Sequence, residues 1–296
     1  MNNKISNITE WMVSFLTICK NNISLSISIF IISIYIFMAI IGPYIIPLDL
    51  VGKNPPYLPP SFKHPLGTDH VGRDILMQIV HGSRDVLTLA SIATLFTILF
   101  SIVIGSISGL LGGKIDLVLT TFTDIILTIP AFPLQIVIAA SIRGAANPVV
   151  LGLVIAFTSW ASPSRSIRSQ VMSIKNRDFV EASRAIGLNS FKILMIDILP
   201  LIAPYIIING LIAFIQAIYS TVGLSLIGAL PWSEVNWGVM INTAVNYTSA
   251  LRDFNPLWYL LGPLLAIITL QLAVLQLSNN IEYLFNPRLR ELYKGK

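Results

Sequence analysis

The chain has 296 residues, 54% of them hydrophobic and only 11% charged, with a formal net charge of +5 and a mean hydropathy of +0.77. Soluble globular domains carry about 25% charged residues, so this balance excludes an ordinary soluble domain and indicates a membrane protein. The basic residues gather at the ends of apolar runs, as orientation in a membrane requires, so we expect no nucleic-acid partner.

The first 22 residues contain a short apolar piece, "WMVSFLTIC", between Lys4 and Lys20. It is too short to cross a bilayer, which requires about 20 apolar residues, so residues 1–22 are expected to form an interfacial segment. Cys19 is the only cysteine in the chain, which excludes an intrachain disulfide.

Apolar runs of helical length predict an all-α membrane protein with six transmembrane helices. The first is expected at 23–46, and the polar, proline-rich stretch that follows it to residue 85 predicts an outer loop in water with a short helix at its end. The other five predicted spans are 86–111, 117–142, 148–162, 193–229 and 257–280, of which the third carries Pro130 and Pro133, a pair that predicts a kink.

Lys and Arg are unevenly divided between the two sides of these predicted spans. With the amino terminus inside, the inner segments carry 13 of them and the outer segments carry 6. The positive-inside bias therefore predicts that both termini and the loop 163–192 face the cytoplasm. The chain then divides into segments 1–22, 23–85, 86–280 and 281–296.

The cytoplasmic loop contains the signals of a short helix. Asp178 and Glu181 have capping-box spacing, so Asp178 is expected to cap the helix and Glu181 to reach back to it. Gly187 suits the left-handed residue that ends a helix. Three residues form one stripe along this helix: Phe179, Ser183 and Ile186. Ala182 and Ala185 keep the helix narrow between them, which predicts a face for docking to another protein. The alternative is a solvated connector whose charges only cap it.

This loop resembles that of the membrane-spanning subunits of binding-protein-dependent ABC importers, whose motif is E-A-A, three residues, Gly, nine residues and I-x-L-P. Five residues match it in register: Glu181, Ala182, Gly187, Leu199 and Pro200. Ser183 and Asp197 depart from it. Further stretches are similar to the dipeptide, oligopeptide and nickel branch of that family, in its C-type subunit: "HPLGTDHVGRDIL" at 64–76, "GLSLIG" at 223–228, "PWSEVNWG" at 231–238 and "NPRLR" at 286–290.

The resemblance implies the type I ABC importer transmembrane fold in the cell (plasma or inner) membrane. It also implies a second, homologous permease subunit, two ATP-binding cassette subunits and an extracytoplasmic solute-binding protein as partners. ATP and Mg are then expected in the ATPase subunits, with no cofactor, metal or catalytic site on this chain. The expected coupling residues are those of the loop helix: Asp178, Phe179, Glu181, Ala182, Ser183, Ala185, Ile186 and Gly187.

No phosphate-loop motif G-x-x-x-x-G-K-[ST] is present, which agrees with a non-enzymatic subunit. The branch imports peptides, nickel and oligosaccharides, so the expected cargo is a peptide or another small polar solute. The competing function is a stand-alone channel or secondary transporter, which predicts several charges within the spans and often an inverted repeat. Asp124 is one of only two charged residues within the predicted spans, the other being Asp197 at the start of the fifth, and no repeat is evident.

A narrow polar stripe runs along the fifth predicted span, at residues spaced 4, 7 and 3 apart: Tyr205, Asn209, Gln216 and Tyr219. Such a stripe avoids lipid, so it either lines a solute pathway or joins a neighbouring helix by hydrogen bonds. Asp124 is likewise either a functional carboxylate or a buried structural contact.

The predicted outer loop holds His64 and His70, with His81 close by, but their spacing lacks a metal-ligand motif, so we expect no metal site. Asp69 is predicted to start the following helix. Four apolar residues of that helix are expected to face the membrane or the partner permease: Ile75, Leu76, Ile79 and Val80.

Trp232 and Trp237 fit an interfacial aromatic belt, with a place near an outer gate as the alternative. Arg288 and Arg290 at the carboxyl end either maintain the positive-inside bias or contact an ATPase.

Overall fold

The computed structural model describes residues 22–47, 51–141, 147–229, 235–248, 250 and 254–285. Helices dominate this part of the chain, and Thr68 and Asp74 form an isolated antiparallel bridge. The helices are α2 (Ile23–Ile40), α3 (Gly42–Ile45), α4 (Ile75–Leu111), α5 (Gly113–Thr128), α6 (Ala131–Ser141), α7 (Pro148–Ser159), α8 (Ala161–Ile174), α9 (Asp178–Ala185), α10 (Ser190–Ile193), a π-helical turn (Leu194–Ile198), α11 (Leu199–Leu226), α12 (Trp237–Asn246) and α13 (Leu257–Phe285). The predicted segment 1–22, Trp232 and the two arginines of the tail lie outside the described residues, apart from Asn22.

Four helical stretches within the described residues are long and apolar enough to cross a membrane: α2, α4, the run Ser190–Leu226 that contains α11, and α13. The pair α5 and α6 makes a fifth if its two bent halves form one span. Helix α7 is apolar but has 12 residues, about 18 Å of rise, which is shorter than the hydrocarbon core. The all-α membrane architecture is therefore confirmed, with four or five spans supported by helix length.

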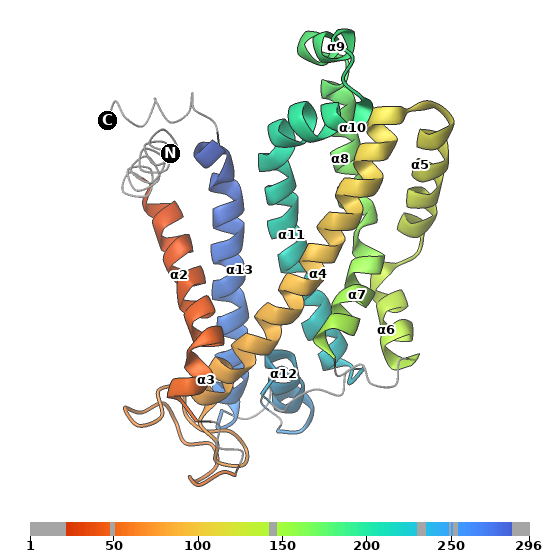
Figure 1. Cartoon of the computed structure of the whole chain (residues 1–296). Coiled ribbons are helices and arrows are strands. Elements are labelled where there is room, and N and C mark those ends of the chain that lie inside the picture. The colour runs from red at the N-terminus through yellow and green to blue at the C-terminus, as the bar shows by residue number, and fades with distance from the viewer. Residues whose placement is uncertain are drawn as a thin grey trace.

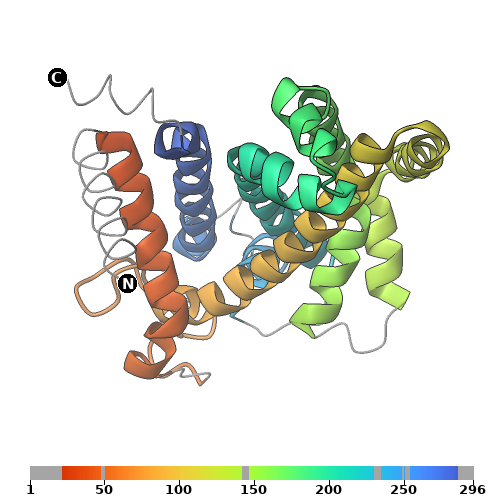
Figure 2. The ribbon, with the colours of Figure 1, turned by 45° about the horizontal axis from the view of Figure 1, so that its top comes forward.

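Helix α4 crosses the whole molecule and packs against α2 at one end and α8 at the other (Figure 1). Its second half approaches α8 very closely, because a Cβ on Gly105 would lie 2.5 Å from the Ser164 carbonyl oxygen and one on Gly109 would lie 2.9 Å from that of Arg168. Small residues permit such close helix packing in membranes. Figure 2 shows α2 and α13 toward one end of α4 and helices α5 to α8 toward the other.

The start of α4 corrects two predictions. Residues 75–85 belong to one continuous helix of 37 residues, so the predicted boundary at residue 85 falls inside α4. The N-cap is Asp74, which accepts a hydrogen bond from the Met77 amide at 3.1 Å. Asp69, predicted to start this helix, is instead fully buried and accepts hydrogen bonds from Arg73 Nε at 2.7 Å and Gln78 Nε2 at 3.0 Å.

The face of α4 predicted to meet lipid or a partner is buried inside the chain itself. Ile75, Ile79 and Val80 are at most 4% exposed and Leu76 is half-buried, because α12 and α13 contact this helix. Trp237 is also fully buried, and its Nε1 donates to the Ile79 carbonyl at 3.0 Å. The interfacial position predicted for Trp237 is therefore wrong.

The kink predicted at Pro130 and Pro133 is confirmed. The axes of α5 and α6 differ by 81°, and Pro130 lies in the two-residue break between them. Proline has no backbone N–H and disfavours helical geometry at the residue before it, which accounts for a break at Ile129.

The three histidines of the outer region each contact a different part of the chain. His64 Nδ1 lies 2.8 Å from Asp74 Oδ2, and His81 Nε2 lies 2.6 Å from the carbonyl oxygen of Ile46. The His70 ring packs 5.7 Å from the ring of Tyr259. No group of three potential metal ligands occurs among the residues that the structure describes.

Candidate functional site

Helix α9 protrudes from the end of the helical bundle opposite α3 (Figure 1). One residue attaches it, since Val180 is fully buried in a cluster formed mainly by α8 and by the run from α10 to α11. The neighbouring Phe179 remains 43% exposed and Ile186 remains 78% exposed. An eight-residue helix that exposes apolar side chains in this way is available for contact with another protein.

The amino-terminal cap of α9 differs from the prediction. The N-cap position belongs to Arg177, and no side chain caps the helix. The amides of Val180 and Glu181 bond to the Arg177 carbonyl instead. Asp178 and Glu181 both lie in the first turn, where their negative charges favour the positive end of the helix dipole.

The carboxyl end of α9 follows the prediction. Gly187 has φ +84°, a left-handed conformation that glycine adopts without steric cost. The Leu188 amide donates to the Ser183 carbonyl at 3.1 Å and the Gly187 amide donates to the Arg184 carbonyl at 2.9 Å. These two bonds form a Schellman motif, which turns the chain and returns Leu188 to the cluster around Val180.

The predicted coupling residues are mostly accessible in this arrangement. Ser183 is half-buried, and the other seven are exposed: Asp178, Phe179, Glu181, Ala182, Ala185, Ile186 and Gly187.

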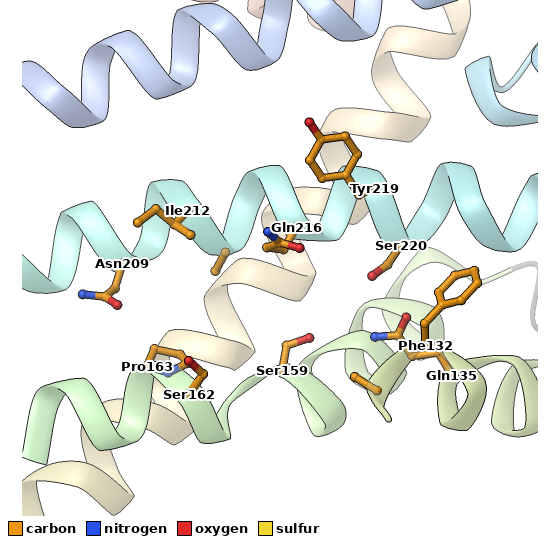
Figure 3. Close-up of a pocket in the computed structure, with 12 residues that line it drawn as sticks. Phe132, Gln135, Ser159, Ser162, Pro163, Asn209, Ile212, Gln216, Tyr219 and Ser220 are labelled. Atoms are coloured by element: carbon orange, nitrogen blue, oxygen red, sulfur yellow. The ribbon is translucent and has the colours of Figure 1, made fainter. Parts of the chain in front are cut away.

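A cavity of about 470 Å³ lies between α11 on one side and α6, α7 and α8 on the other (Figure 3). Three residues of the predicted polar stripe line it: Asn209, Gln216 and Tyr219. Tyr205 lines a separate cavity of about 350 Å³ nearer α9, together with Gln170 and Arg177. The stripe therefore borders two cavities rather than one.

The larger cavity is lined without any charged side chain. Beyond the stripe, Ser220 lines it one turn after Gln216 on the same helix. Its other polar groups come from different helices, which the periodicity of α11 does not reveal: Gln135, Ser159 and Ser162. Amides and hydroxyls can hydrogen-bond a neutral polar solute without the desolvation cost of a buried charge. Size and lining both resemble those of small-molecule sites, which occupy about 300–1,000 Å³.

Gln135 has an orientation fixed by its neighbour. Thr158 donates its hydroxyl hydrogen to the Ile155 carbonyl at 2.9 Å, so its oxygen can only accept from Gln135. Gln135 accordingly presents Nε2 to Thr158 at 2.7 Å. Its Oε1 is enclosed and accepts no hydrogen bond within the described part of the chain, which makes it a buried acceptor in need of a donor.

Two ion pairs join α5 to α8. Asp124, the predicted intramembrane carboxylate, pairs with Arg165, and both side chains are 54% exposed. The buried contact considered for Asp124 is therefore not formed within this chain. Asp116, which the sequence analysis did not single out, binds Arg168 in a more enclosed pair, and this hydrogen bond raises the pKa of Arg168.

Part of the predicted cytoplasmic loop 163–192 is thus helix α8, which follows α7 after Trp160 alone. The sequence contains a signal for this pairing. The two aspartates are eight residues apart and the two arginines are three apart, so the acids share one face of α5 and the bases share one face of α8.

Comparison with known proteins identifies the family. Residues 101–291 match the family described as "Binding-protein-dependent transport system inner membrane component". The chain is 30% identical over 273 residues to the oligopeptide transport system permease protein OppC of Lactococcus lactis, covering 91% of this chain and 92% of that protein. It is 31% identical over 282 residues to the dipeptide transport system permease protein DppC of Haemophilus influenzae, covering 92% and 93%.

A third relative is DppC of Bacillus subtilis, 27% identical over 274 residues, with 92% of this chain and 83% of that protein covered. The family match spans more than half of the chain, and the relatives match it nearly end to end. The chain therefore belongs to the binding-protein-dependent transport system inner membrane components, as a non-catalytic, multi-pass permease subunit of an ABC importer.

Proposed function

We propose that this chain forms half of the membrane pathway of an ATP-driven peptide importer and that α9 couples the pathway to cytoplasmic ATPases. The observation that carries the coupling role is the contrast between Val180, which anchors α9, and the exposed Phe179 and Ile186 beside it. A short helix held at one point can transmit a movement of a bound partner to the bundle beneath it.

The proposed assembly contains a second, homologous permease, two ATP-binding cassette subunits that supply the ATP and Mg chemistry, and an extracytoplasmic binding protein. In this assembly both termini of the chain are cytoplasmic and the chain crosses the membrane six times. The bent pair α5 and α6 then counts as one span and the short α7 as another. The family to which the chain belongs supports the partner classes in outline.

The proposed pathway runs along the polar face of α11. Asn209, Gln216 and Tyr219 border the larger cavity and Tyr205 borders the smaller one, which lies nearer α9. A peptide backbone offers alternating amide donors and carbonyl acceptors, which suits an uncharged lining of amides and hydroxyls. The names of the relatives, oligopeptide and dipeptide permeases, favour the same class of cargo.

The test is ATP-dependent uptake of a short peptide by proteoliposomes that contain all the proposed subunits. Gly187→Arg is expected to abolish uptake and ATPase docking while the chain still inserts into the membrane. The matched control is Gly228→Arg, which alters another left-handed glycine with open space around it, away from α9. Uptake by the purified chain without ATPases, or unchanged uptake with Gly187→Arg, contradicts the proposal.

A further inference from the structure

A groove also lies between α2 and α4, apart from the two cavities along α11. Its volume is about 460 Å³. Five of its nine lining residues are apolar: Ile36, Ala39, Ile40, Leu87 and Ile92. Its polar groups are the Arg84 guanidinium and the hydroxyls of Tyr44, Thr88 and Ser91.

The cation of this groove lies near the end of the membrane-embedded helices. His81 contacts the Ile46 carbonyl, where α3 has just ended, and Arg84 follows His81 by one helical turn. The irregular backbone that precedes α4 must lie outside the hydrocarbon core. Ile36 is ten residues before Ile46, about 15 Å of helix rise further in. The groove therefore extends from the membrane interface toward the hydrocarbon interior.

Arg84 is exposed and has no ion pair or hydrogen bond within the described part of the chain. An arginine at this depth extends its head toward the interface or pairs with an anion. The hydroxyl of Thr88 lies one turn further along the same helix and lines the same groove. A guanidinium with neighbouring hydroxyl donors matches the oxygens of a phosphate group.

We propose that this α2–α4 groove binds one anionic phospholipid, with its phosphate at Arg84 and an acyl chain along Ile36 and Ile40. Basic pockets between transmembrane helices bind anionic headgroups in this way. The occupant is a lipid and not a helix of the second permease, because the groove has the polarity of a lipid: its cation lies at the interface and its apolar wall extends inward from there. The inference requires only that the chain is embedded in a membrane, and it does not depend on the cargo.

The experiment is native mass spectrometry of the assembled importer, with phosphatidylglycerol or phosphatidylcholine of identical acyl chains added. The wild-type complex is expected to retain one phosphatidylglycerol in preference to phosphatidylcholine. Arg84→Gln is expected to weaken retention of phosphatidylglycerol about tenfold and to leave phosphatidylcholine unchanged. Lys114→Gln, which removes an exposed cation at the other end of α4, is the matched control and is expected to change neither.

A second variant keeps the inference testable if Arg84→Gln does not assemble. Ile40→Trp fills the apolar wall without changing charge, and it is expected to lower phosphatidylglycerol retention as well. Equal retention by the wild type and either variant overturns the proposal. Displacement of the lipid by millimolar inorganic phosphate overturns it too. So does a crosslinking experiment in which Ser91→Cys reacts with the second permease and not with an added photoactivatable phosphatidylglycerol.

Discussion

Arg168 binds Asp116 through two parallel hydrogen bonds, with Nε 2.6 Å from Oδ1 and Nη2 2.6 Å from Oδ2. This bidentate contact joins α8 to α5, and its side chains are 29% and 16% exposed. The parallel pair, Arg165 with Asp124, joins the same helices but is 54% exposed on both sides. The two pairs therefore offer a comparison of enclosed and exposed charge within one interface.

The enclosed pair is expected to couple more strongly. A double-mutant cycle with Asp116→Asn and Arg168→Gln should give a coupling free energy of about 1–3 kcal/mol in the unfolding of the purified chain. The same cycle with Asp124→Asn and Arg165→Gln should give less than about 1 kcal/mol, because solvent screens an exposed pair. Equal coupling free energies in both cycles would contradict the expectation that the more enclosed ion pair couples more strongly.

The neighbours Val180 and Phe179 are expected to separate stability from coupling. Val180→Ala removes buried methyl groups and should cost about 2 kcal/mol of stability, seen as a lower unfolding temperature. Phe179→Ala should leave that temperature unchanged, because the ring is 43% exposed. It should instead reduce binding of the ATPase subunits about tenfold or more, as loss of an aromatic anchor does.

These two variants are measured in the same preparation, by thermal unfolding of the chain and by co-purification with the ATPases. A fall in unfolding temperature with Phe179→Ala would mean that the ring supports the fold. Full ATPase binding by that variant would remove α9 from the contact.

Gly187→Ala is expected to weaken the end of α9 through the backbone alone. A Cβ at this position meets nothing within 4 Å, so no clash is introduced. A left-handed conformation costs a residue with a side chain about 1–2 kcal/mol. The expected result is slower coupled ATP hydrolysis in proteoliposomes. Gly113→Ala, with φ +57° and equally open space, is the control, and an equal loss with it would assign the effect to general strain.

Helix α9 was predictable because its signals are local. The acids of its first turn and Gly187 fix bounds that the structure reproduces from Asp178 to Ala185. Only its cap was misassigned, by one residue: Arg177 has the extended backbone of an N-cap, and Asp178 is already helical. Local sequence signals place a helix end only to within one or two residues. Gly187 needed no distant partner to reveal its conformation.

The start of α4 was not predictable from local pattern. Gln78 is polar yet fully buried, and its Nε2 donates to Asp69, nine residues earlier. The sequence around Trp237 is typical of an interfacial tryptophan, but its ring packs on Gly82, where a Cβ would lie 2.8 Å from the ring. Such positions depend on contacts between segments distant in sequence, and hydrophobic periodicity does not contain them.

Gln135 belongs to the same class, because its significance depends on Thr158 of another helix. If the cavity beside it receives peptide, then Oε1 is expected to accept from a backbone N–H once the surrounding side chains make room. Gln135→Met retains the length of the side chain and removes the acceptor. The KM for ATP-driven uptake of tetra-alanine should rise about two- to tenfold, which is the effect of losing one hydrogen bond.

Thr158→Val supplies an independent test of this prediction, because it leaves Gln135 in place and removes the hydroxyl that orients its amide. The same rise in KM is expected, with the amount of assembled complex unchanged. Gln276→Met is the matched control, since Gln276 is an exposed glutamine on α13 and does not line the cavity. An unchanged KM for both cavity variants would contradict a role in binding cargo. A loss of assembled complex with both would assign Gln135 to the packing of α6 against α7, because a residue that only supports the fold changes the amount of transporter and not its affinity.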